Sequence, residues 1–201
     1  TTYLLPWAVP AFITIMFFSI LFAANAPLTE VLNSLLGNTQ PGDMLNIKNT
    51  AWGTRIVLII LQGWLGSSYI FLLSTGILQG IPKDLYEAAE IDGATGFQQT
   101  RHITIPILLY QTAPLMIGQY TFNFNNFSII YLFNSGGPFE RSKYGNLAGS
   151  TDILISYIYK LTIENQYQGI GSAITVVVSI FIIFVTWIGF SRTKAFREES
   201  L

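Results

Sequence analysis

The chain has no cysteine and little charge for its length. Without thiols it forms neither disulfides nor thiolate metal sites, so cysteine usage leaves the redox compartment undetermined. Asp, Glu, Lys and Arg make up 10% of its 201 residues, whereas 51% are hydrophobic. A soluble domain carries about a quarter of its residues as charged side chains, so this chain lacks the polar surface that such a domain needs. The composition excludes a water-soluble globule and predicts apolar side chains that face lipid.

Two further absences limit the function. No glycine-rich segment ending in Gly-Lys-Ser or Gly-Lys-Thr occurs, so we expect no nucleotide bound by this chain. The formal net charge of −1 indicates neither nucleic acid nor an acidic partner. The chain also begins at Thr1 without methionine or a basic leader, and we interpret it as a fragment that lacks earlier segments.

Long hydrophobic runs are the main positive feature. Crossing about 30 Å of hydrocarbon takes roughly 20 helical residues. Four stretches meet this length, at about residues 4–24, 53–80, 107–133 and 170–190. They predict an all-α polytopic membrane protein with about four transmembrane helices in one domain, residues 1–201.

The basic residues give a partial indication of orientation. Arg192, Lys194 and Arg197 follow the last stretch, and such a cluster favours the cytoplasm. Residues 81–106 are then cytoplasmic, and residues 25–52 and 134–168 form outside loops. These outside loops contain basic residues that oppose the assignment, namely Lys48, Arg141, Lys143 and Lys160. Because both loops are rich in Asn, Gly, Ser and Thr, we expect hydrated surface long enough to bind another protein.

The cytoplasmic segment contains its own helical pattern. Pro82 stands where a first helical turn tolerates proline, and Gly93 where a helix needs a left-handed cap, so we expect a short helix of about ten residues. Leu85, Ala88, Ala89 and Asp92 share one mostly small stripe of that helix, which lets another backbone approach closely. Pro106 marks the expected return to the membrane. A helix-turn-helix elbow is the simplest construction.

The elbow resembles a known sequence motif. Glu87-Ala88-Ala89, Asp92-Gly93-Ala94, Ile103 and Pro106 are similar to the EAA loop of ABC importer permeases, although Ile105 replaces the usual leucine. The resemblance implies a MetI-like transmembrane core. It also implies that a separate cytoplasmic ATPase dimer, which uses ATP and Mg²⁺, is contacted through Glu87, Ala88, Ala89, Asp92, Gly93 and Ala94. The chain would then be a transporter subunit rather than an enzyme, paired with a second homologous permease and an extracellular sugar-binding protein.

Amide side chains lie within two of the predicted crossings. An unpaired amide in hydrocarbon costs several kcal/mol, so these groups must face another helix or a watery path. In the third crossing Gln119, Phe122, Asn123 and Asn126 follow helical spacing and predict one stripe. In the second crossing the same register places Gln62, Leu65, Gly66 and Tyr69 on one face.

Two interpretations of these faces remain open. Uncharged amides beside aromatic rings suit a neutral ligand rich in hydroxyl groups, whereas an ion would favour carboxylates. Alternatively, the amides hold neighbouring helices together, at about 1 kcal/mol each. Spacing alone does not decide between a sugar site and helix packing.

A second resemblance favours the sugar. Residues 121–127 and the run Asn134-Ser135-Gly136-Gly137-Pro138 are similar to the larger, MalF-type permease subunit of maltose importers. The resemblance covers nearly the whole chain and implies import of maltodextrin-type oligosaccharides across a prokaryotic plasma membrane. It places sugar contacts at Gln62, Leu65, Gly66, Tyr69, Gln119, Phe122, Asn123 and Asn126, with Thr14 as a replacement for a hydroxyl contact in the first crossing. Gln62 and Gln119 depart from the Asn and Ser that the family shows.

Three alternatives have different consequences. An importer of another polar solute would share the elbow but would not need the amide and aromatic faces. A membrane-embedded enzyme would need two or more ionisable groups at midplane depth, and the predicted crossings offer essentially none. A passive channel or an assembly protein would not need the EAA-like elbow.

Overall fold

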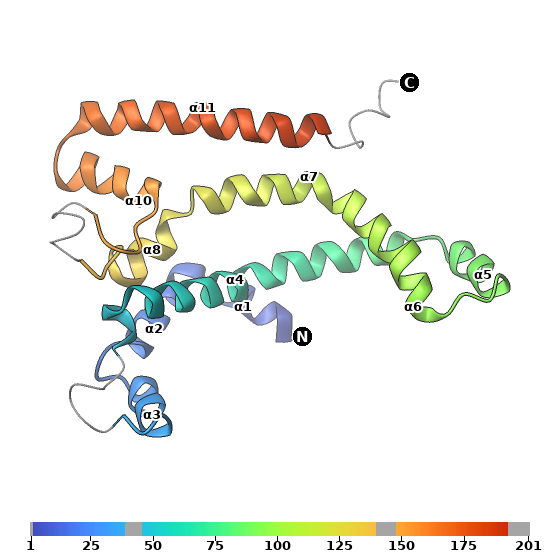
Figure 1. Ribbon diagram of the computed structural model, residues 1–201, viewed down its shortest axis with the longest axis horizontal. Helices are drawn as coiled ribbons and strands as arrows, with labels where there is room; N and C mark the ends of the chain where they lie inside the picture. The colour runs from blue at the N-terminus through green and yellow to red at the C-terminus, as the bar shows by residue number, and fades with distance from the viewer. Residues whose placement is uncertain (1, 39–45, 140–147, 193–201) are drawn as a thin grey trace. The chain divides into compact units, whose positions relative to one another are not determined.

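The computed structural model describes residues 2–38, 46–139 and 148–192, which are mainly helical. The chain divides into two compact units, Thr1–Ser68 with Asn125–Val178, and Tyr69–Phe124 with Ser179–Leu201. Two long helices, α4 (Ala51–Gly80) and α11 (Gln168–Arg192), pass from one unit into the other. Figure 1 shows each of them as an uninterrupted ribbon.

The first unit has a small apolar core. It contains η1 (Thr2–Leu4), α1 (Leu5–Ala8), α2 (Ala11–Leu21), α3 (Pro27–Leu35), η2 (Ile47–Asn49), α8 (Phe127–Asn134), α10 (Leu154–Tyr159) and the π-helical turn η4 (Lys160–Glu164). Side chains of α2, α4 and α8 form the core, centred on the fully buried Leu61 and Phe133. A hydrogen bond from Ser19 Oγ to the Phe133 carbonyl, 2.6 Å long, joins α2 to the end of α8.

The second unit contains the elbow and one further long helix. Its other elements are α5 (Lys83–Ile91), α6 (Gly96–Gln99), the π-helical turn η3 (Thr100–Thr104) and α7 (Ile105–Phe124). Here α7 packs on the end of α11, where the Phe124 and Phe181 rings lie 6.4 Å apart and the Thr121 and Thr186 hydroxyls 3.2 Å apart.

Two of the four predicted crossings are confirmed as long apolar helices. Among the described residues, Ala51–Gly80 and Gln168–Ser191 are long and apolar enough to cross a bilayer. The first predicted crossing is wrong as a single helix, because the extended Val9 and Pro10 separate α1 from α2. The proline has no N–H with which to continue the α1 ladder. The remaining α2 has 11 residues and is about 16 Å long.

The third predicted crossing is also interrupted. α7 ends at Phe124 and α8 begins at Phe127. Between them the Phe127 N–H donates to the Asn125 carbonyl at 2.9 Å, and Asn126 has φ −80° and ψ 78°. This is the geometry of an inverse γ-turn, which breaks the helical register. The predicted stripe through Gln119, Phe122, Asn123 and Asn126 is therefore wrong at its last member.

The elbow forms as predicted at its first helix. α5 has nine residues and ends before Gly93, which has φ 76°. The Ala94 N–H donates to the Ala89 carbonyl and the Gly93 N–H to the Glu90 carbonyl, so the cap is a Schellman motif. Pro82 precedes the helix as its N-cap residue.

Pro106 lies within a helical stretch, and its role in marking the return to the membrane stays a prediction. The backbone is helical from Gly96 through η3 to Phe124, so Pro106 lies inside a continuous helix and not at its start. A proline ring collides with the carbonyl four residues earlier, here that of His102. The π-helical turn at Thr100–Thr104 widens the backbone at this place and accommodates the proline.

The two predicted outside loops are more structured than expected. They contain α3, η2, α10 and η4, and the side chain of Lys160 is 4% exposed. The expectation of hydrated surface is therefore wrong at Lys160. The basic residues Arg141, Lys143, Lys194 and Arg197 lie outside the described residues.

Candidate functional site

The predicted face of α4 forms on one continuous helix. Gln62, Leu65 and Gly66 lie in the first unit and are each half-buried, and Tyr69 follows one turn later. Leu65 packs against the apolar core. A Cβ added to Gly66 would meet no atom within 4 Å, so the helix surface beside Gly66 is open. This face offers one amide next to free space.

The γ-turn brings a second amide to this face. Asn126 Nδ2 donates to Gln62 Oε1 at 3.4 Å, which is a long hydrogen bond between α4 and the start of α8. Gln62 and Asn126 are thus neighbours within one unit, although they are 64 residues apart in the chain. The sequence predicted both residues for one site, but through a helical stripe that the turn replaces. An amide side chain carries both donor and acceptor groups, which is the chemistry that a hydroxyl-rich ligand needs.

The remaining predicted contacts lie on other elements. Asn123 Nδ2 donates to the Gln119 carbonyl at 2.8 Å within α7, and Phe122 is 63% exposed on the same helix. Gln119 is half-buried. Thr14 lies half-buried in α2, beside the buried Ile15. Their roles in binding stay predictions.

The predicted coupling residues gather at the elbow. Glu87, Ala88, Asp92 and Gly93 are exposed, and Ala89 and Ala94 are half-buried. Tyr86 Oη and Thr104 Oγ1 lie 2.9 Å apart and join α5 to η3. Residues at the end of α5 and in α6 and η3 surround an open hollow of about 370 Å³. It is lined by Ala89, Asp92, Gly93, Ala94, Gln98, Gln99, His102 and Ile103. Four of the six predicted coupling residues line this hollow.

Two large apolar side chains stand in the chain next to residues that line the hollow. Ile91 is 87% exposed and Phe97 is 74% exposed, on α5 and α6 respectively. Exposed apolar groups around a small-residue hollow are typical of a protein-binding surface.

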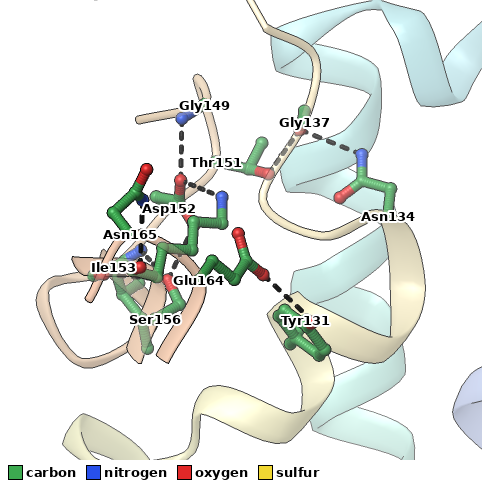
Figure 2. A network of polar contacts seen from close by, with 11 residues as sticks. Tyr131, Asn134, Gly137, Gly149, Thr151, Asp152, Ile153, Ser156, Glu164 and Asn165 are labelled. Carbon is green, nitrogen blue, oxygen red and sulfur yellow. Dashed lines mark hydrogen bonds and ion pairs between the residues drawn. The ribbon is translucent and has the colours of Figure 1, made fainter. Parts of the chain in front are cut away.

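A network of buried polar groups in the first unit was not anticipated (Figure 2). Lys160 Nζ and Asp152 Oδ2 lie 2.5 Å apart, and both side chains are 4% exposed. Asp152 also accepts the Gly149 N–H at 2.7 Å and the Ser156 hydroxyl at 2.8 Å. The sequence carries a signal for this site, because Asp152, Ser156 and Lys160 are spaced by four residues and fall on one helical face.

A second lysine is also partly withdrawn from water. Lys48 Nζ donates to the Ser19 carbonyl at 3.1 Å and to Ser19 Oγ at 2.8 Å, and it lies 5.4 Å from the centre of the Phe133 ring. Burial lowers the pKa of Lys48 below the ordinary lysine value. Both described lysines of the predicted outside loops thus bind other parts of the first unit.

Comparisons with known proteins agree on one family. The family model described as "Binding-protein-dependent transport system inner membrane component" matches residues 1–190. The chain is 50% identical over 205 residues to the maltodextrin transport system permease protein MdxF of Bacillus subtilis (strain 168), covering 99% of this chain and 46% of that protein. It is 47% identical over 200 residues to the galactooligosaccharides transport system permease protein GanP of the same organism, covering 100% of this chain and 46% of that protein.

Less similar proteins also match the chain. The maltose/maltodextrin permease MalF of Escherichia coli (strain K12) is 39% identical over 182 residues, which cover 89% of this chain and 34% of that protein. A crystal structure of a bacterial ABC transporter that imports the acidic polysaccharide alginate matches with a TM-score of 0.74 at 16% identity, over 97% of this chain and 64% of that one. The chain spans less than half the length of the curated relatives it matches. The chain belongs to the family of binding-protein-dependent transport system inner membrane components.

Proposed function

We propose that the protein is a permease subunit of an ATP-driven ABC importer that carries neutral oligosaccharides of the maltodextrin type by alternating access. The observation that carries the substrate proposal is the Gln62–Asn126 amide pair beside the open surface at Gly66. Hydroxyl groups of a sugar both donate and accept hydrogen bonds, and amides offer both partners without charge. The permeases for maltodextrins and galactooligosaccharides among the relatives support the same class of ligand.

The charge pattern favours a neutral sugar over an acidic one. α7 carries no ionisable residue other than tyrosine, and α4 carries no charged residue beyond Arg55. Arg55 Nη2 donates to the Ser150 carbonyl at 2.7 Å, so the guanidinium is engaged in the first unit. Recognition of a carboxylate-rich polysaccharide would favour Arg or Lys in the path. The likeness to the alginate importer is therefore a likeness of fold.

The proposal assigns partners to the elbow and to the two outside segments. The elbow, residues 81–106, contacts a cytoplasmic ATPase dimer, which binds ATP and Mg²⁺. Residues 25–52 and 134–168 face outward, where a sugar-binding protein docks, and a second homologous permease completes the path. The subunit is multi-pass and lies in the plasma membrane of a prokaryote. The exposed small and apolar residues of the elbow support the ATPase contact.

Uptake by the assembled complex tests the proposal. The full-length protein, its partner permease, the ATPase and the binding protein are reconstituted in vesicles, and ATP-dependent uptake is measured for labelled maltotriose, a galactooligosaccharide and an alginate oligosaccharide. We expect maltotriose to be taken up best and alginate not at all. Preference for the galactooligosaccharide would change the sugar but keep the neutral class. Uptake of alginate alone would contradict the proposed site.

A further inference from the structure

The Asp152–Lys160 pair joins two parts of the segment that follows α8. Asp152 lies just before α10, and Lys160 begins the turn η4 after it. The carboxylate accepts from Gly149, Ser156 and Lys160, and the Lys160 ammonium also lies 4.7 Å from the centre of the Phe139 ring. A buried ion pair is weak evidence for stability, because desolvation offsets much of the attraction. Fixing one geometry is the better-attested use of such a pair.

The geometry that it fixes extends to the start of α8. The Tyr159 ring, next to Lys160, stacks on the Phe127 ring with centres 5.0 Å apart. Tyr131, one turn further along α8, lies edge-on to Tyr159 at 5.0 Å, and its hydroxyl donates to Glu164 Oε1 at 3.1 Å. Phe127 directly follows Asn126. Lys160 is thus linked to the proposed sugar amide through one aromatic stack.

The same segment also holds the other end of α8 (Figure 2). Asn134 Nδ2 donates to the Gly137 carbonyl at 2.9 Å, and Thr151 Oγ1 donates to the same carbonyl at 2.5 Å. The Thr151 N–H donates to the Gly136 carbonyl at 3.1 Å. Both ends of α8 thus contact residues near the ion pair, so a shift of α10 would act on the start and the end of this helix.

Asn126 is the residue most sensitive to such a shift. It lies in the γ-turn, where no continuous helical ladder fixes its backbone, and its bond to Gln62 is already 3.4 Å long. A displacement of a few tenths of an ångström would break that bond. The position of the amide therefore depends on how α8 is held.

We propose that the Asp152–Lys160 ion pair is a positioning element that sets the sugar affinity through Asn126, without itself touching the sugar. This inference rests on the proposed sugar site at Gln62 and Asn126. It predicts that loss of the pair weakens sugar binding even where the complex assembles normally.

The test separates position from stability. In the full-length protein, assembled with its partners, Lys160→Met leaves a buried carboxylate without its cation, so we expect less assembled complex. Asp152→Asn/Lys160→Met removes the uncompensated charge, and the amount of complex should recover. The half-saturating maltotriose concentration should still rise by about threefold to tenfold in this double variant, as expected for coupled neighbouring groups. If that concentration equals the wild-type value, the pair only stabilises the fold and the proposal is overturned.

A double-mutant cycle tests the route. Asn126→Ala is combined with Asp152→Asn/Lys160→Met, and half-saturation is measured for each protein. If the pair acts through Asn126, the combined variant should lie within about twofold of Asn126→Ala alone. If the combined variant shows the product of the two separate fold-changes in half-saturation, the pair does not act through Asn126. If Asn126→Ala leaves the half-saturating concentration unchanged, both the proposed sugar site and this inference are contradicted. If Asn126→Ala raises that concentration but Asp152→Asn/Lys160→Met does not, only this inference is contradicted.

Discussion

The segment after α8 and the elbow after α4 are two polar connections that differ in burial. In the first, Ser150, Thr151, Ser156 and Lys160 are buried, and their polar groups find partners within the same unit. In the second, α5, α6 and η3 contain no buried residue, and Ile91 and Phe97 are among the most exposed apolar side chains. The difference teaches that one connection is packed into its unit, while the other leaves its side chains accessible, as the proposed ATPase contact requires.

The largest expected effect tests the packed connection. A Cβ at Gly149 would overlap the Gly136 carbonyl carbon and oxygen, and backbone atoms cannot move aside as a flexible side chain can. Gly149→Ala should therefore destabilise the first unit by about 3 kcal/mol or more. The amount of folded protein in membranes and its thermal unfolding in detergent measure this loss.

Gly169 provides the matched control. It lies in the first turn of α11 in the same unit, and an added Cβ would meet no atom within 4 Å. Gly169→Ala should change stability by less than about 1 kcal/mol. Equal losses for both variants would show that the connection is not tightly packed.

The next largest expected effect concerns the amides proposed to bind the sugar. Asn126→Ala removes an amide of the proposed sugar site, and Asn123→Ala removes one that the sequence predicts to contact the sugar. Leaving a sugar group unpaired costs about 1–3 kcal/mol. Sugar affinity should fall by about 5- to 150-fold. Uptake of labelled maltotriose at several concentrations measures the change, and the mutant complexes should still assemble.

Phe124→Leu is the control for the amide variants. The Phe124 ring packs against Tyr120 and Phe181 on the α11 side of α7. Because a volume-tolerant substitution costs less than about 1.5 kcal/mol, uptake should stay within about threefold of wild type. Identical kinetics for Asn123→Ala, Asn126→Ala and Phe124→Leu would favour helix packing as the role of the amides.

The exposed connection should fail differently. Gly93 has φ 76°, where a β-branched side chain costs about 1–2 kcal/mol, so Gly93→Val should distort the Schellman cap and displace Glu87. Sugar uptake should be lost while membrane insertion persists, since no core residue is touched. ATPase binding to membranes and uptake measure the two consequences. Normal uptake by Gly93→Val would show that the elbow is only a connector.

Sequence reasoning succeeded where one local rule decided the structure. The Pro82 and Gly93 signals gave the limits of α5, and the long apolar runs gave α4 and α11. It failed where two rules competed. The apolar run through residues 107–133 favoured one helix, but Asn125 and Asn126 are of a type that favours turns over helix interiors, and a backbone bond closes a turn there.

The contact between Gln62 and Asn126 was only partly predictable from the sequence. Gln62 and Asn126 were both expected to bind the ligand, yet their contact depends on a γ-turn that no periodicity encodes. The Asp152–Lys160 pair was missed because a loop rich in Gly, Ser and Thr was taken as hydrated. Burial of that loop depends on long-range contacts, such as the Thr151 bonds to Gly136 and Gly137, which composition does not report.

The smallest expected effect sharpens the comparison within the elbow itself. Thr95 and Gln98 form a capping box at the start of α6, in which Thr95 Oγ1 accepts the Gln98 N–H and Gln98 Oε1 accepts the Thr95 N–H. Thr95→Ala should cost about 1 kcal/mol, the usual value of an N-cap residue.

The control is Thr100→Ala, whose hydroxyl only donates back to the Gly96 carbonyl at 2.9 Å, a bond that contributes little to a helix. Because neither residue contacts a core, both variants should insert and assemble. Hydrogen exchange should therefore speed up at the first amides of α6 in Thr95→Ala alone, with a modest loss of uptake. Faster exchange throughout the first unit would show that the elbow and the segment after α8 unfold together. Their different burial indicates instead that they unfold independently.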